Sequence, residues 1–574
     1  MSELPISNDL ARAAPPPNGS LYWRQLLPLL AVVAFSIVLR IRIASIPLER
    51  DEGGYAYIAT RWLAGDVPYR DAFDQKPPGT YLAYASAFVL GAKSKEAIHW
   101  LGHLWLVGAA VFVYLIGRQF LSSLVGVLAA LCLFVLVMDA SVLGNASNTE
   151  VFAILPMSAA TFFSLRAGEN GRWRDGVLAG VCAGLSLVFK QVSAPVVAFQ
   201  AGWILWRQLR LRRIAADGAS STTAIGGAAS VARPASSLVA IIAGFAAGAA
   251  IVLALPCAYF AAKGAWQPFY DCVVGHNLAY SSRIPLSGYA INLQYGFNNI
   301  FAAQWPIVLA AVVGVLALLR SRSPAVAACI AWWVTSLAAV SVGGFFREHY
   351  FILLMPPSSL IAACGVEFLA RCLESKRADW QLRIAAAIGV LVVAWPIYYH
   401  LDYFLARSPD VIARRLYHFN PFVESEAVAK LLREKSSESD RIFIYGSEPQ
   451  IFFQAGRVSA SRYMYLYPLF GRDPESADRQ RAVLAELERE RPKFLIIVRV
   501  PTSFVADPNA PQLLARELPK ITDESYELFA YVIVVTDGTY RIVPVEPGKK
   551  ELALAPGSIA ANEEVSLVIW VREN

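Results

Sequence analysis

The sequence predicts a polytopic α-helical membrane protein that ends in a soluble α/β domain. Hydrophobic residues make up 56% of the 574-residue chain and charged residues only 17%, against about 25% in a typical soluble domain. The deficit comes from long apolar runs, several of which reach the roughly 20 residues that cross a bilayer. After residue 405 the pattern changes to short apolar segments that alternate with amphipathic ones, which indicates a soluble fold.

The apolar segments predict about eleven spans. They lie at residues 26–46, 98–117, 121–138, 151–166, 176–189, 191–206, 237–260, 299–319, 324–342, 350–370 and 382–402. The first segment is too long for the core of a signal peptide, so we interpret it as a retained span. The expected organisation is a disordered cytoplasmic tail at 1–25, a membrane module at 26–404 and a soluble domain at 405–574.

Basic residues in the short loops predict the orientation. With the N-terminus inside, about fifteen Lys and Arg residues fall in the short inner loops, against about four in the short outer loops, namely Lys190, Lys263, Arg283 and Arg347. This is the bias of the positive-inside rule. The net charge of +7 therefore reflects topology and does not indicate a nucleic-acid partner. Residues 176–206 are expected to form two short spans that meet at Lys190-Gln191, because a single helix would invert every later loop. The Ala-, Gly- and Ser-rich segment 214–236 reads as a flexible inner linker.

This topology places two large loops, at 47–97 and 261–298, and the soluble tail on the outer side. We expect a bacterial inner (plasma) membrane with these parts in the periplasm. Residues 79–91 are only partly apolar and are expected to lie along the outer membrane surface as a juxtamembrane helix.

The soluble tail shows strand and helix patterns. Strands are predicted at Arg441–Tyr445 and Phe494–Val500, a helix at Ala477–Arg491, and a hairpin from Tyr531–Val535 and Tyr540–Val545. All seven cysteines lie before this tail. It therefore has no disulfide framework, and the chain has no CxxC spacing that would indicate a zinc site.

The first outer loop holds the most informative polar residues. Residues 50–54 read Arg-Asp-Glu-Gly-Gly, and residues 74–78 read Asp-Gln-Lys-Pro-Pro. Carboxylates this close to lipid need cationic partners or a wet cavity, and a carboxylate is a usual base for an incoming hydroxyl. Lys76 suits an anionic leaving group such as phosphate, and the two prolines fix the backbone directly after it.

A simpler interpretation of the acidic pair is also open. Asp51 and Glu52 are expected to cap a surface helix that runs to about Leu63, because acidic residues stabilise a helix N-terminus. The two interpretations are compatible, since a cap can also fix a catalytic carboxylate.

The pattern resembles the family 39/83 glycosyltransferases of the GT-C fold. This group includes protein O-mannosyltransferases, aminoarabinose transferases of lipid A and rhizobial lipid A galacturonosyltransferases. The features in common are the acidic pair after the first span, Tyr55 one turn later, Gly-x-x-Pro-Tyr at 65–69 and Lys-Pro-Pro at 76–78. Less specific likenesses are His276-Asn277 with Tyr280, and Arg347-Glu348-His349-Tyr350 running into Met355-Pro356.

The resemblance implies roles for the matching residues. Asp51 would be the general base that deprotonates the acceptor, and Glu52 its neighbour that shapes the site. Lys76 would bind the phosphate of the donor, with Arg283 and Arg347 as helpers. Further candidates for substrate binding, with a weaker basis, are Tyr55, Asp74, Asp139, Glu150, His276, Tyr280, His349 and Tyr350.

The resemblance does not carry a metal site over to this chain. In the aminoarabinose transferases a glutamate precedes the motif lysine and, with a loop histidine, forms a metal site. The corresponding residue here is Gln75, and a neutral amide is a poor metal ligand. Because Asp74 and His276 are nearby, a divalent metal stays an open alternative, and no cofactor is assigned.

The leading hypothesis is a glycosyltransferase of class EC 2.4 that moves one sugar from a polyprenyl phosphate to a lipid, glycan or protein acceptor. In-line attack would invert the anomeric centre, and the lack of a Gly-rich phosphate loop agrees with a lipid donor. The alternative is a transporter or flippase for polyprenyl-linked saccharides, in which the acidic pair couples protons. That function needs charges deep within spans, and the sequence has few of them. A membrane-anchored scaffold is a third possibility, but it would not need eleven spans.

Overall fold

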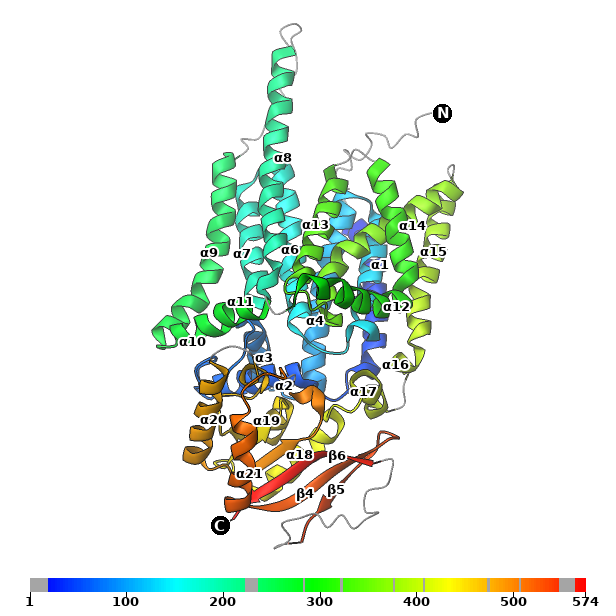
Figure 1. Cartoon of the computed structure of the whole chain (residues 1–574). Coiled ribbons are helices and arrows are strands. Elements are labelled where there is room, and N and C mark those ends of the chain that lie inside the picture. The colour runs from blue at the N-terminus through cyan, green and yellow to red at the C-terminus, as the bar shows by residue number, and fades with distance from the viewer. Residues whose placement is uncertain are drawn as a thin grey trace. The chain divides into compact units, whose positions relative to one another are not determined.

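The computed structural model describes residues 19–221, 236–281, 284–320, 324–374, 377–405, 408–471, 475–504, 507–546 and 563–573. The chain divides into two compact units (Figure 1). The first, here called the bundle unit, comprises Met1–Arg42, Gly102–Cys257 and Ala279–Leu405. The second, here called the loop–domain unit, comprises Ile43–Leu101, Ala258–Leu278 and Ala406–Asn574.

Among the described residues, helices occupy all eleven positions of the expected spans. These are α1 (Gly19–Ile43), α4 (Lys95–Phe120), α5 (Ser123–Val137), α6 (Thr149–Asn170), α7 (Trp173–Phe189), α8 (Ala194–Ser221), α9 (Leu238–Ala262), α12 (Leu286–Arg320), α13 (Pro324–Ser341), α14 (Met355–Leu373) and α15 (Ala378–Tyr399). Within the part of the chain that the structure describes, eight helical segments are long and apolar enough to cross a membrane, and α5, α7 and α8 are not among them. The prediction of a polytopic helical membrane protein is confirmed.

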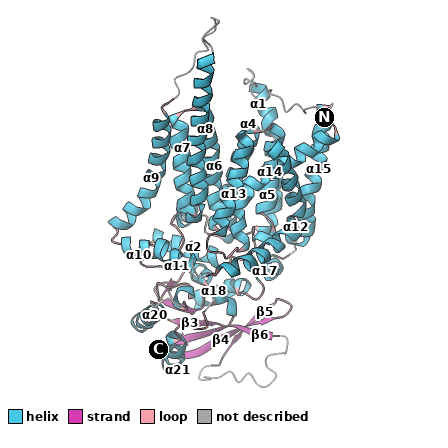
Figure 2. Ribbon diagram, turned by 45° about the horizontal axis from the view of Figure 1, so that its top comes forward, coloured by secondary structure: helices cyan, strands magenta, loops and turns pink. Residues whose placement is uncertain are grey.

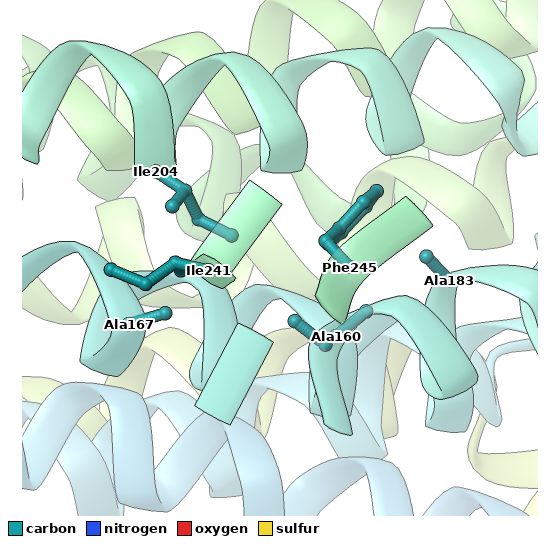
Figure 3. Close-up of a cluster of buried hydrophobic side chains, with 7 residues drawn as sticks. Ala160, Ala167, Ala183, Ile204, Ile241 and Phe245 are labelled. Atoms are coloured by element: carbon teal, nitrogen blue, oxygen red, sulfur yellow. The ribbon is translucent and has the colours of Figure 1, made fainter. Parts of the chain in front are cut away.

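Small side chains let the helices of the bundle unit pack closely. Figure 3 shows one such cluster, in which alanines of α6 and α7 meet Ile204 of α8 and Ile241 and Phe245 of α9. Between α12 and α14, a Cβ atom on Gly365 would lie 1.9 Å from the Ala310 carbonyl oxygen. Such contacts are the usual basis of helix association in lipid, where burial of apolar surface gives no driving force.

Three helix boundaries in the bundle unit differ clearly from the sequence prediction, and one agrees. Helix α12 begins at Leu286, inside the loop expected at 261–298 and before the expected start of the span at 299. The break at Lys190 is confirmed, because α7 ends at Phe189 and Lys190 is extended before α8 begins at Ala194. Helix α1 begins at Gly19, inside the segment expected to be disordered. Helix α8 continues to Ser221, into the expected linker, and the linker residues 222–235 lie outside the described residues.

The loop–domain unit joins the first outer loop to the soluble tail. The loop forms α2 (Arg50–Leu63) and α3 (Gly79–Val89), and the segment after α9 forms α10 (Trp266–Tyr270), the π-helix η4 (Asp271–Gly275) and the start of α11 (His276–Ser281). The tail contributes α17 (Pro409–Tyr417), α18 (Phe422–Lys435), α19 (Pro449–Ala455), α20 (Ser476–Glu490) and α21 (Leu513–Ser525). Short helices complete the two units, among them α16 (Leu401–Leu405) and the 3-10 turns Ala140–Val142, Gln191–Ser193, Glu348–Leu354, Tyr467–Leu469 and Pro501–Ser503.

The tail strands form one mixed sheet (Figure 2). The strands are β1 (Arg441–Tyr445), β2 (Val458–Ser459), β3 (Phe494–Val498), β4 (Tyr526–Val535), β5 (Tyr540–Pro544) and β6 (Glu563–Arg572), in the order β2-β1-β3-β6-β4-β5. Strand β1 is parallel to β2 and β3, while β6 is antiparallel to β3 and β4. The predicted strands, helix and hairpin are confirmed, whereas β6 was not predicted.

Candidate functional site

The predicted surface helix is present as α2, but its cap is Glu49. The Glu49 carboxylate accepts hydrogen bonds from the backbone N–H groups of Asp51 (3.0 Å) and Glu52 (3.2 Å). In return, the Glu52 carboxylate accepts from the Glu49 N–H (3.4 Å), which completes a capping box. A capped helix is present as predicted, but the prediction that Asp51 and Glu52 cap it is wrong, because the cap is Glu49. The half-buried Asp51 carboxylate lies in the first turn, where the helix dipole favours negative charge.

Glu52 is fully buried against a histidine that the sequence analysis did not select. His99 Nε2 lies 3.2 Å from Glu52 Oε1, and His99 Nδ1 lies 2.6 Å from the Ala44 carbonyl oxygen. A carbonyl can only accept, so Nδ1 carries a proton, and the contact with Glu52 needs one further proton on either partner. The pair ties the start of α4 to the segment that precedes α2.

Two tyrosines, Tyr55 and Tyr465, lie near the Asp51 side chain. The Tyr55 hydroxyl lies 3.5 Å from Asp51 Oδ2, and the Tyr55 ring packs against the rings of Tyr81 and Tyr84. Burial raises the pKa of Tyr465 well above its usual value, and the negative charges of Asp74 and Asp51 raise it further. The two aspartates therefore lie near the same buried phenol, which stays protonated at neutral pH.

The Lys76 loop is held by hydrogen bonds on both sides of its backbone. Asp74 Oδ1 accepts from the N–H groups of Gln75 (2.6 Å) and Lys76 (3.3 Å). The Lys76 carbonyl accepts from the hydroxyls of Tyr69 (2.7 Å) and Tyr81 (3.2 Å). These bonds fix the backbone from which the half-buried Lys76 side chain extends, as expected for a residue that presents a charge at a defined point.

The second outer loop contacts the Lys76 loop directly. The Asn277 amide donates to the Gln75 carbonyl oxygen (2.7 Å), and the His276 ring packs edge-on against Phe73, with centroids 5.5 Å apart. Asp51, Glu52, Tyr55, Asp74, Lys76 and His276, all selected from the sequence, thus belong to one compact unit. Within the described residues, no group of three or more His, Cys, Asp or Glu residues could hold a metal ion.

Other selected residues belong to the bundle unit. Lys190 Nζ lies 2.6 Å from Glu150 Oε1 and 4.9 Å from the centroid of the Tyr350 ring, so Glu150 and Tyr350 share one cation. The buried Asp139 accepts from Ser141 and lies 3.4 Å from His400 Nε2. His349 packs edge-on against Tyr350, and Arg347 is exposed. Arg283 and the side chain of Tyr280 lie outside the described residues.

Arg50, directly before Asp51, is bound by the tail domain. Its Nη2 lies 2.6 Å from Glu448 Oε1 and 3.1 Å from Asn420 Oδ1, and its Nε donates to the Ser447 carbonyl. Ser447 and Glu448 follow the carboxyl end of β1, where open α/β sheets commonly bind ligands. In this chain that position binds the side chain of Arg50 from α2, the helix that carries the proposed base Asp51.

The two glycines after the acidic pair allow this contact. A Cβ on Gly53 would lie 2.4 Å from Gln450 Cα, and a Cβ on Gly54 would lie 1.7 Å from the Tyr465 hydroxyl oxygen. Any larger residue at either position would force α2 away from α19 or from Tyr465.

Gly53→Ala and Gly54→Ala are expected to destabilise the loop–domain unit by about 1–3 kcal/mol each, as overpacking does. Gly53→Ala should cost more, since it meets backbone, whereas Gly54→Ala meets the end of a side chain. Thermal unfolding of the detergent-solubilised protein measures both effects. Adding Tyr465→Ala should relieve Gly54→Ala but not Gly53→Ala, and equal relief of both would contradict the packing described.

The carboxyl group of Asp74 predicts a pH dependence of stability. Burial raises its pKa from 3.8 to about 6, although the Lys76 ammonium opposes the change. The unfolded chain then loses its proton first, so the free energy of unfolding falls as the pH rises from 3.8 to about 6. Asp74→Asn keeps the acceptor oxygen and removes the titration. We expect the variant to match the wild type near pH 4 and to exceed it by up to about 3 kcal/mol at pH 7.

Asp71→Asn is the matched control, because the hydrogen bond with Arg70 lowers the pKa of Asp71. Its contribution has the opposite sign and is lost only as the pH falls below 3.8. The Asp71→Asn variant should therefore be less stable than the wild type by a similar amount at pH 4 and at pH 7. Thermal unfolding at the two pH values distinguishes the variants. Parallel pH profiles for Asp74→Asn and the wild type would refute the assignment.

Comparison with known proteins gives a fold and a family match over part of the chain. Residues 75–234 match the sequence model of the family described as dolichyl-phosphate-mannose-protein mannosyltransferase. A search of the curated proteins gave no match. Among solved structures, ArnT from Cupriavidus metallidurans bound to undecaprenyl phosphate is 12% identical, with a TM-score of 0.56, over 92% of this chain and 99% of that one. Its apo state gives 13% identity and a TM-score of 0.54, over 92% and 98%.

A second similar structure is the archaeal oligosaccharyltransferase AglB from Archaeoglobus fulgidus in complex with an inhibitory peptide and a dolichol-phosphate. It is 13% identical, with a TM-score of 0.50, and the likeness covers 96% of this chain and 76% of that one. At such low identity the likeness is one of fold. It confirms the GT-C fold expected from the residues around the acidic pair. The family match over residues 75–234 supports a glycosyltransferase of that fold.

Proposed function

We propose that this chain transfers a single sugar from a polyprenyl-phosphate donor to a hydroxyl group of a lipid, glycan or protein on the outer, periplasmic face of a bacterial inner membrane. The observation that carries the proposal is the pairing of Asp51 with the Lys76 loop in one unit. The half-buried Asp51 carboxylate and the Lys76 ammonium, on a loop with a fixed backbone, lie near the same buried group, because the charges of both act on the pKa of Asp74. Such a site provides a base for the acceptor and a cation for the leaving phosphate.

The choice of donor rests on the similar proteins. The family match begins at Gln75 and so includes Lys76-Pro77-Pro78. The ArnT structure holds undecaprenyl phosphate and the AglB structure a dolichol-phosphate. A lipid phosphate is the ligand these have in common, and Lys76 offers the charge that would bind it.

In the proposed reaction, Asp51 accepts the proton of the acceptor hydroxyl as its oxygen attacks the anomeric carbon. The new glycosidic C–O bond forms while the bond from that carbon to the phosphate oxygen breaks. The phosphate leaves with the bonding electrons, and Lys76 stabilises its added negative charge. Attack opposite the leaving group inverts the anomeric centre, and the products are the glycosylated acceptor, polyprenyl phosphate and a protonated Asp51.

The neighbouring residues would position these two groups. Glu52, fixed by His99, holds the first turn of α2, and Asp74 holds the backbone of Lys76. Tyr55 and His276 remain candidates for contacts with the substrates. Arg283, Arg347, Tyr280, His349, Tyr350, Asp139 and Glu150 also remain proposals, and the bond from Lys190 to Glu150 leaves the latter least suited to act as a free base.

A cell-free assay distinguishes transfer from transport. The purified protein is mixed in detergent with the polyprenyl-lipid fraction and the outer-membrane lipids of the source cell, and released polyprenyl phosphate is measured by mass spectrometry. A transferase should release polyprenyl phosphate and add one sugar mass to an acceptor. A flippase needs a sealed membrane and would leave the lipid-linked sugar intact. If neither product forms, and deletion of the gene leaves every cell-envelope glycoconjugate unchanged, the transferase proposal fails.

Lys76→Met tests the phosphate role in the same assay. It should lower the rate by about 10²–10³-fold, the usual effect of removing one preorganised group that stabilises developing charge. Lys93→Met removes an exposed lysine of the same loop and should leave the rate unchanged. A rate for Lys76→Met within threefold of the wild type would rule out Lys76 as the phosphate ligand.

A further inference from the structure

The segment after α9 has an exposed apolar face that the proposed reaction does not use. Helix α10, the π-helix η4 and α11 follow one another without a gap from Trp266 to Ser281. Four apolar side chains in this stretch are spaced four residues apart and exposed to solvent. They are Trp266 (44% exposed), Tyr270 (46%), Val274 (37%) and Leu278 (67%), here called the apolar stripe.

The π-helix keeps these four side chains on one face. In an α-helix of 3.6 residues per turn, four residues turn about 40° more than one full turn, so side chains four apart drift steadily around the helix. A π turn holds more residues than an α turn and so rotates less per residue, which offsets the drift. The π-helix η4 lies between Tyr270 and Leu278, so it offsets the drift within the stripe.

The other faces of the segment differ from the apolar stripe. Gln267 and Asp271 are exposed and joined by a hydrogen bond of 2.8 Å, so they form a polar ridge beside the stripe. Phe269 and Cys272 are buried. An apolar face, a polar face and a face packed on protein are what a helix at a bilayer surface requires.

The segment is attached to the end of a membrane-crossing helix. Helix α9 has the highest mean hydropathy of the candidate spans among the described residues, 2.7, and ends at Ala262, only four positions before Trp266. Phe260, in its last turn, stacks on Phe269 of α10, with centroids 4.7 Å apart and planes within 13°. The Tyr259 hydroxyl accepts a hydrogen bond from the Trp62 indole N–H at 2.6 Å. This packing holds α10 at the level where α9 leaves the bilayer.

We infer that the segment from Trp266 to Leu278 lies in the membrane–water interface, with the apolar stripe inserted among phospholipids and its opposite face supporting the Lys76 loop. Trp and Tyr are the side chains most favoured at that level, and both are in the stripe. The support for the loop consists of the bond from Asn277 to the Gln75 carbonyl and the contact of His276 with Phe73. Membrane lipid thus becomes part of what holds the loop in place, whether or not the chain transfers sugar.

Quenching by brominated lipid tests this inference. Cys182, Cys257 and Cys372, the cysteines that are not buried, are replaced by Ala or Ser. Single cysteines are then introduced as Val274→Cys and Leu278→Cys in the stripe, and as Gln267→Cys and Asp271→Cys in the ridge. Each variant carries a bimane label and is reconstituted into phospholipid vesicles, with or without lipids brominated near the headgroup end of the acyl chains.

Labels in the stripe should be quenched at least about threefold more than labels in the ridge, since a helix of this kind inserts only one face by about 5–10 Å. Two stripe positions are used so that one poorly folded variant does not decide the result. Equal quenching on both faces, weak or strong, would overturn the inference. A second measurement compares labelling of the stripe by a membrane-impermeant maleimide in native membranes and in vesicles that contain only this protein and lipid. Shielding in native membranes alone would also overturn the inference, because a protein partner would then cover the stripe.

Discussion

Asp51→Asn is expected to reduce the rate of sugar transfer by about 10²–10⁴-fold, the usual contribution of a general base. The amide has the shape of the carboxylate but cannot accept the proton of the acceptor. The fold should persist, because Glu49 caps α2 and the Asp51 side chain takes no part in the cap. The measurement is release of polyprenyl phosphate by the purified variant, together with the glycolipid and glycoprotein masses of a deletion strain that expresses it.

Asp66→Asn is the control for this prediction. Asp66 follows the same helix and pairs with Arg61 at 2.7 Å, with both side chains partly exposed. Its loss should change the rate by less than about twofold, because such surface pairs contribute little. An Asp51→Asn protein that accumulates normally and keeps more than a third of the wild-type rate would sink the assignment of Asp51 as the base.

Glu448→Ala is expected to lower the free energy of unfolding of the loop–domain unit by about 3–5 kcal/mol, the cost of leaving one charge of a buried pair without its partner. The side chains of Arg50 and Glu448 are only 12% and 0% exposed. The Arg50 guanidinium would stay buried with no carboxylate beside it. Limited proteolysis and thermal unfolding of the solubilised protein measure the loss, and α2 should become the new site of cleavage.

The pair Lys95–Glu426 is the matched control. It has the same 2.6 Å separation, but its side chains are 22% and 44% exposed. Glu426→Ala should therefore cost no more than about 1 kcal/mol. The double variant Arg50→Met with Glu448→Met should recover most of the stability, because apolar replacement of a buried pair is often neutral. Similar losses of unfolding free energy for Glu448→Ala and Glu426→Ala would show that burial does not determine how much the Arg50–Glu448 pair contributes to stability.

Patterns that repeat along the chain predicted the fold well. The length and hydropathy of the apolar runs located the helices, and the basic residue Lys190 located the break between α7 and α8. Alternating apolar residues located β1, β3 and the β4–β5 hairpin. The periodicity is a local property, so it can be read without knowledge of the tertiary structure.

The predictions that failed concern residues whose partners are distant in the sequence, or a residue type that is uncommon at its position. Glu49 was not recognised as a cap because Ser, Thr, Asp and Asn are the favoured types, although Glu52 three residues later was a readable signal. His99 lies at the start of an apolar helix, and only the fold shows that it faces Glu52. The insertion of β6 between β3 and β4 likewise has no local signal, although its alternating apolar residues mark it as a strand.

The motif indicated the proposed site, whereas the residues that support it were not predicted. Asp51 and Lys76 stood out because charges next to a membrane span are rare. Arg50 was read only as a nearby cation, since its partner Glu448 is 398 residues further along the chain. Gly53 and Gly54 were quoted as part of the motif without a reason, and the reason lies in the backbone of Gln450 and in Tyr465.

The distance along the chain between Arg50 and Glu448 has a consequence for biosynthesis. Helix α2 is made early, but the carboxylate that binds Arg50 is translated 398 residues later, which takes roughly 20–80 s at about 5–20 residues per second. Through that interval the remaining membrane helices are made and inserted, while α2 lacks its contact with the tail domain. A chain cut short before the tail would lack the carboxylate that binds Arg50, directly before the proposed base, so the order of translation leaves this support of the proposed site until last.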